Sequence, residues 1–118
     1  MATYVNNLRL KEIATGAESG TWGTSTNTNL ELIGEGLGFA TINIASDANV
    51  TETVADGSAD NARAMYIKVT STTLTATRTL TIAPNTIKRV HIIENASTGS
   101  QDITIKQGSG STVTIPNG

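Results

Sequence analysis

Very few side chains of this sequence could take part in bond-making chemistry. The chain of 118 residues contains one histidine, His91, and no cysteine. A catalytic triad or a zinc site needs several such groups, because an imidazole must be oriented by a second group or joined by further ligands. One copy of the chain supplies neither arrangement. We therefore expect a protein that is not an enzyme and that uses no metal and no cofactor.

Two segments have some features of ligand-binding loops. Gly34, Gly36 and Gly38 suggest a phosphate loop, but they end a helical pattern instead of preceding one, and neither glycine motif of nucleotide-binding proteins is present. Residues 56–61 contain two aspartates, but the residue order of an EF-hand loop and its final glutamate are missing. The first segment is predicted to be a helix exit and the second a solvated turn.

Trp22 is the side chain best suited to binding a partner. It is the only tryptophan, and tryptophan is enriched among the residues that contribute most to protein interfaces. It precedes a pattern in which Leu30, Ile33 and Leu37 recur at helical spacing. Two interpretations stay open, because this apolar stripe could pack on the chain's own core or dock on another molecule. The residues that we assign to docking are Trp22, Asn27, Asn29, Leu30, Ile33 and Leu37.

The helical pattern covers residues 22–38, and Thr28 and Glu31 have the spacing of a capping box. Each glycine in its last turns costs about 1 kcal/mol relative to alanine. A helix this short is marginal in water, so we expect it to be ordered only where its apolar stripe is docked. Residues 1–20 contain one short alternating run and are predicted to form an extended arm. Residues 1–38 are therefore assigned to an N-terminal arm and attachment helix.

From Thr41 onward apolar and polar residues alternate with a period of two, and clusters of turn-forming residues separate the runs. Threonine is the most frequent residue, which also favours strands. Seven short strands predict a mainly β chain, with an antiparallel β-sandwich or jelly roll over residues 39–118. Segment 88–94 is apolar on both faces and is expected to be a central strand. The predicted strands are Thr41–Ala45, Val50–Ala55, Ala64–Thr70, Thr79–Ala83, Lys88–Glu94, Asp102–Lys106 and Thr112–Ile115.

Five threonines alternate with other residues between positions 73 and 81. If this segment is one strand, their hydroxyl groups lie on one face of it. Such a face could bind a sugar, and a solvated face of an edge strand is the simpler interpretation.

The charges of the chain argue against two classes of partner. The net charge is −2, and no run of lysine or arginine is present. Proteins that bind nucleic acid or anionic membranes concentrate positive charge on one surface. No stretch approaches the length of a membrane span, and the first 20 residues lack the pattern of a signal peptide. We expect a soluble chain that binds neither nucleic acid nor a membrane.

The sequence ends at a strand followed by the turn-forming pair Asn117 and Gly118. Such a pair commonly introduces the second strand of a hairpin. We therefore expect that the β-sandwich is truncated at its C-terminal end and that the chain continues beyond Gly118, with a true terminus at an exposed turn as the alternative.

Several segments resemble the N-terminal region of tail-fibre and virion structural proteins of tailed bacteriophages, especially those of marine bacteria. The likeness covers nearly the whole chain, and the run from Trp22 through Asn27 and Asn29 is its most distinctive part. The segments that carry it are Tyr4–Gly16, Gly20–Ile33, Thr53–Gly57, Arg63–Tyr66, Thr81–Thr86, Ile93–Gln101 and Lys106–Gly110.

This resemblance implies a structural component of the virion, made in the host cytoplasm and located in the phage tail. It implies a homotrimer that forms the anchoring domain of a tail fibre and docks on tail adaptor or nozzle proteins. Alternatives are another virion role, as a capsid decoration or tail-tube protein, and a carbohydrate-binding β-sandwich module. The resemblance supplies no catalytic residues.

Overall fold

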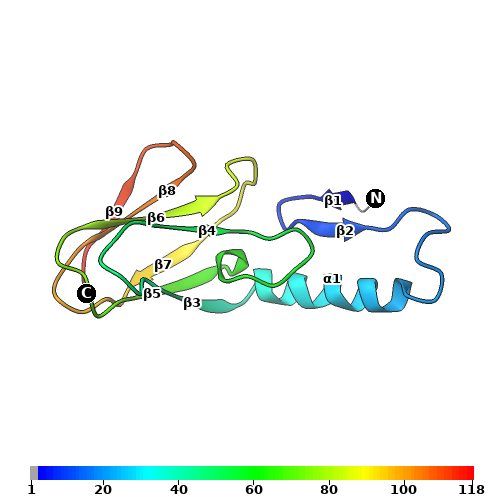
Figure 1. Ribbon diagram of the computed structural model, residues 1–118, viewed down its shortest axis with the longest axis horizontal. Coiled ribbons are helices and arrows are strands. Elements are labelled where there is room, and N and C mark those ends of the chain that lie inside the picture. The colour runs from blue at the N-terminus through cyan, green and yellow to red at the C-terminus, as the bar shows by residue number, and fades with distance from the viewer. Residues whose placement is uncertain (1–2) are drawn as a thin grey trace.

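The computed structural model describes residues 3–118 and shows an elongated molecule of 54 × 23 × 22 Å. A hairpin and a helix occupy one end, and two β-sheets occupy the other (Figure 1). The elements are β1 (Thr3–Val5), β2 (Leu10–Glu12), α1 (Trp22–Gly36), β3 (Phe39–Asn43), β4 (Val50–Thr53), the 3-10 helix η1 (Asn61–Arg63), β5 (Tyr66–Thr70), β6 (Arg78–Ala83), β7 (Ile92–Asn95), β8 (Ile103–Gln107) and β9 (Val113–Ile115). The expectation of a mainly β chain with one short helix is confirmed.

The predicted antiparallel pairing is wrong for most of the strands. One sheet has the order β3-β5-β7 and the other the order β4-β6-β8-β9, and within them only β8 and β9 are antiparallel. The chain crosses from one sheet to the other after each strand from β3 to β7, and β9 then follows β8 in the same sheet. Each crossing reverses the direction of the chain, so two crossings return it to its original direction. Successive strands of one sheet are therefore parallel. This winding is typical of parallel β-helices, and residues 3–118 form neither a closed barrel nor a jelly roll.

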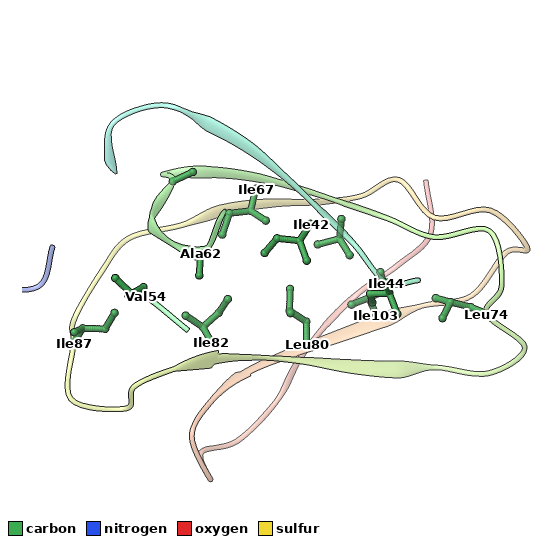
Figure 2. Packing of buried hydrophobic residues seen from close by; sticks show 12 residues of the cluster. Ile42, Ile44, Val54, Ala62, Ile67, Leu74, Leu80, Ile82, Ile87 and Ile103 are labelled. Atoms are coloured by element: carbon green, nitrogen blue, oxygen red, sulfur yellow. The ribbon is translucent and has the colours of Figure 1, made fainter. Parts of the chain in front are cut away.

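The core lies between these two sheets. Ile42 and Ile67 from the first sheet point toward Leu80, Ile82 and Ile103 from the second (Figure 2). All five side chains are buried. Alternation along each strand places these residues inside and their threonine or lysine neighbours outside, as the period of two predicts. The core is aliphatic and contains no aromatic side chain among the described residues.

Six of the seven predicted strands are found within a few residues of their expected bounds. Segment 88–94 is the exception, because only its last part belongs to β7 and that strand is the last of its sheet. The segment has apolar residues on both faces although only one face is packed, because Val90 and Ile92 face solvent. The row of threonines is also divided: Thr79 and Thr81 lie in β6, whereas the preceding residues form bends. No single strand therefore carries all five hydroxyl groups.

Residues 3–12 form a hairpin in place of the predicted extended arm. Strands β1 and β2 pair as an antiparallel hairpin, with Tyr4 opposite Lys11, and the hairpin lies along the helix (Figure 1). Helix α1 begins at Trp22, after Thr21, and ends two residues before the predicted bound. Thr28 is inside the helix, so the predicted capping box is wrong. Residues 34–38 form the helix exit, as predicted.

Candidate functional site

Helix α1 contacts its own chain through a stripe that the hydrophobic pattern did not indicate. Leu32 and Gly36 are buried, and Asn29 lies on the same side. The Asn29 side chain brackets the backbone of Lys11: its Oδ1 accepts from Lys11 N at 3.0 Å, and its Nδ2 donates to Lys11 O at 2.9 Å. Asn29 therefore joins the helix to β2, and both ends of its side-chain amide are occupied by these hydrogen bonds.

The predicted apolar stripe is displaced by one residue, or about 100° around the helix, from the buried one. Trp22 and Leu30 are each 61% exposed and Leu37 is 69% exposed. Asn27 is exposed as well, and Ile33 is half-buried. The own-core interpretation of this stripe is therefore wrong for its three largest exposed side chains. The regular spacing of Asn29, Leu32 and Gly36 was the available signal for the packed face.

Part of the exposed stripe continues into a groove between the helix and the sheets. Ile33 and Leu37 line this groove together with Leu8, Met65 and Val90, and its volume is about 410 Å³. Val90 is 74% exposed. Large apolar side chains that gather in this way often mark an interface with another protein. The groove extends the exposed apolar surface onto residues that the helical pattern could not include.

A second apolar feature crosses the outer face of the first sheet. Phe39, Tyr66 and Ile92 are aligned by the register of β3, β5 and β7, and the first two rings stack with their centroids 5.3 Å apart. The Tyr66 hydroxyl donates to Glu94, and this hydrogen bond with the carboxylate raises the pKa of Tyr66. Phe39 and Ile92 are more than half exposed.

The two ends of the molecule are joined by a buried arginine. Arg63 has no exposed surface, and its Nη1 donates to Leu8 O in the hairpin turn. Its Nη2 donates to Ala55 O at 2.7 Å and to Ser58 O at 2.9 Å, and it lies 3.2 Å from an Asp60 carboxylate oxygen. One side chain thus holds backbone from both the hairpin and the β4–η1 loop.

Close packing supports this junction. A Cβ atom on Gly36 would lie 2.6 Å from Leu8, and one on Gly57 would lie 2.5 Å from the Tyr4 ring. Gly57 also has a φ of +63°, which favours glycine. Gly57 N donates to Arg9 O at 2.8 Å, and Arg9 pairs with Asp56. The hairpin turn therefore packs closely against the end of α1 and the β4–η1 loop.

The candidate ligand groups have structural roles. Asp60 accepts hydrogen bonds from Ala55 N and Arg63 N, so the segment predicted to be a solvated turn forms part of the junction. His91 Nδ1 lies 2.8 Å from Ala64 O, and burial lowers the pKa of its imidazole. Among residues 3–118, no three His, Cys, Asp or Glu side chains gather as metal ligands would. No helix in this part of the chain is long and apolar enough to cross a membrane.

The search for similar proteins gives no relative on which to base an assignment. No protein-family model, curated protein or solved structure matches the chain. The exposed helix stripe, the groove beside it and the closely packed junction are the features of the described residues that bear most on function.

Proposed function

We propose that the chain is a structural virion protein, the N-terminal anchoring domain of a phage tail fibre, and that it assembles as a homotrimer. The exposure of Trp22, Leu30 and Leu37 carries this proposal. Trp22 and Leu30 lie on helix α1 and Leu37 directly follows it, and the helix is already held to its own chain through another stripe. Their exposure therefore has no role in the packing of the monomer, and burial against a partner would be favourable.

The size of the apolar surface supports a protein partner. A fully buried aliphatic side chain contributes about 1.5–3 kcal/mol relative to an exposed one. Leu30, Leu37 and Val90 are all more than half exposed, and Trp22 adds the residue type most often found as an interface anchor. We assign this surface to contacts between fibre chains and with adaptor or nozzle proteins of the tail.

The junction supports a mechanical role. A fibre must transmit its orientation from the attachment point to its distal part, so the docking helix has to be fixed relative to the domain that follows. Arg63 and the packing of Leu8 on Gly36 supply that connection. The assignment to a virion rests on the resemblance of the sequence segments described above.

Oligomeric state tests the assembly. We expect the full chain to elute as a trimer in size-exclusion chromatography with light scattering. Replacing Leu30 and Leu37 by Ser is expected to give a monomer with an unchanged circular dichroism spectrum in the β region. Glu31→Ser, on an exposed position of the same helix, is the control and is expected to remain trimeric. A monomeric wild-type chain, or a trimeric double variant, would contradict the proposal.

Location in the particle tests the anchoring role. Gold-labelled antibodies against the chain should mark the tail of purified virions, at the base of the fibres. Label over the capsid would instead indicate a decoration protein.

A further inference from the structure

The exposed apolar stripe of α1 has the spacing of a coiled-coil seam. Leu30, Ile33 and Leu37 are separated by steps of three and four residues, and Thr26 precedes Leu30 by four. Side chains that recur at a mean spacing of about 3.5 residues stay turned toward the neighbouring helices of a coiled coil. A second copy of the chain carries a stripe with the same spacing, so the seam is complementary to itself.

The rest of the chain leaves this seam uncovered. Leu30 and Leu37 are both more than half exposed. Asn29 and Leu32 hold the helix to its own chain from a side that lies about 100° away around the helix. Helices of other copies can therefore reach the seam without displacing the hairpin.

The charges of α1 do not oppose contact between copies. The charged residues of the helix are Glu31 and Glu35, and both are exposed. At about 100° per residue they lie on the side of the helix opposite the seam. Identical helices can therefore pack through the seam without bringing like charges together. The seam itself has no charge that would select a charged partner.

The flank of the seam that faces away from the hairpin contains two glycines. A Cβ atom on Gly23 or Gly34 would meet nothing within 4 Å, and neither residue has a positive φ. The chain's own packing therefore does not require glycine there, although glycine is unfavourable relative to alanine inside a helix. The distance between packed helices depends on the side chains at their contact, and glycine permits a close approach. The open space beside these glycines is available to the helix of another copy.

We propose that α1 of three copies forms a parallel, in-register coiled coil through Thr26, Leu30, Ile33 and Leu37. The inference rests on the proposed function, and it names the contact that holds the homotrimer together. In the heptad nomenclature, Leu30 and Leu37 occupy a positions and Ile33 occupies a d position. Leucine at a with isoleucine at d favours three or four strands over two. The helices are parallel because the symmetry axis of a closed trimer leaves the direction along itself unchanged.

Two features of the chain favour this short coiled coil. The helix is already held by Asn29 and by the burial of Leu32, so association does not have to supply the free energy of helix formation. The groove lined by Met65 and Val90 continues the seam from Leu37 toward the sheets. Since α1 lies along the length of the molecule, three parallel copies place their sheets at the same end (Figure 1). The three grooves then lie at the same height and can be buried in the same contact.

Cysteine cross-linking of the full chain tests the direction and register of the helices. The sequence contains no cysteine, so one introduced thiol reports one contact. In the parallel coiled coil, identical seam residues meet at the axis, and Thr26→Cys should give disulfide-linked dimers when oxidised with copper phenanthroline. Thr24→Cys, at an exposed position on another side of the helix, is the matched control and should stay unlinked. If Thr26→Cys linked only to added Leu37→Cys chains, the helices would be antiparallel and the proposal would be overturned.

An exchange of leucine and isoleucine tests the packing in the seam. The triple variant Leu30→Ile, Ile33→Leu and Leu37→Ile keeps the apolar composition, but isoleucine at a with leucine at d favours two strands. We expect the mass from light scattering to fall from three copies to two, with an unchanged circular dichroism spectrum. Ile92→Leu, at an exposed position of the first sheet, is the control and should remain trimeric. A triple variant that also remains trimeric would overturn the coiled coil.

These measurements separate the coiled coil from the proposed function. A trimeric wild-type chain in which Thr26→Cys stays unlinked would contradict the coiled coil alone, and antibody label at the base of the fibres would still support anchoring. A monomeric wild-type chain would contradict both the coiled coil and the homotrimer of the proposed function.

Discussion

The two ends of this molecule are stabilised in different ways. In residues 39–118, an aliphatic core joins two largely parallel sheets, and its central side chains are fully buried. In the described residues before position 39, Leu32 is the only buried large apolar side chain. Hydrogen bonds from Asn29 and contacts with the sheets hold that end in place. The sheet end is thus stabilised mainly by apolar burial, whereas the helix end relies on hydrogen bonds and contacts with the rest of the chain.

Substitution of Arg63 should have the largest effect, because this residue joins the two regions. Arg63→Met removes hydrogen bonds to Leu8, Ala55 and Ser58 and leaves the Asp60 carboxylate without a cationic partner, with only its two backbone hydrogen bonds. We expect a loss of about 3–5 kcal/mol in the free energy of unfolding. Urea denaturation measures that loss, and hydrogen exchange should show faster opening of α1 than of the sheets. Lys68→Met is the control for the loss of one positive charge.

If exchange accelerated equally in both regions, the helix end would not be the dependent part. That outcome would contradict the comparison.

A smaller effect is expected inside the helix end. Asn29→Ala removes both hydrogen bonds to Lys11, whereas Asn27→Ala changes an exposed residue of the same type two positions away. We expect Asn29→Ala to cost about 1–2 kcal/mol and Asn27→Ala to change stability by less than about 0.5 kcal/mol. Hydrogen exchange of the α1 amides distinguishes them. Similar protection in the two variants would show that the Asn29 hydrogen bonds do not hold the helix.

The smallest effect concerns pH at the sheet end. Burial lowers the pKa of His91 below 6.5, so the unfolded chain binds more protons than the folded one just below that pH. Stability is therefore complete above pH 6.5 and falls as the pH decreases toward the folded-state pKa. Urea denaturation between about pH 7.5 and pH 5.5 should show this decline in the wild type and less of it in His91→Gln. If the free energy of unfolding changed with pH equally in the wild type and in His91→Gln, His91 would not contribute to the pH dependence of stability.

The sequence was informative wherever a local pattern determines the structure. Apolar spacing and the terminal glycines located α1, and the period of two located most strands. The same period occurs in parallel and antiparallel sheets, so it could not reveal the direction of pairing. The packed side of α1 was missed because Asn29 and Gly36 contact β2 and Leu8 without being hydrophobic. Arg63 was missed because its partner Leu8 is distant in the sequence.

The winding of the chain between two sheets also has an evolutionary consequence. Each turn of the winding, such as the segment from Phe39 to its register partner Tyr66, rests on the turn before it and supports the next. In such repeating architectures, stability is close to a sum of contributions from neighbouring units. Duplication or loss of one whole turn would therefore preserve the contacts of the others. We therefore expect that this architecture can lengthen or shorten by one whole turn while the helix and its junction with the first turn stay the same.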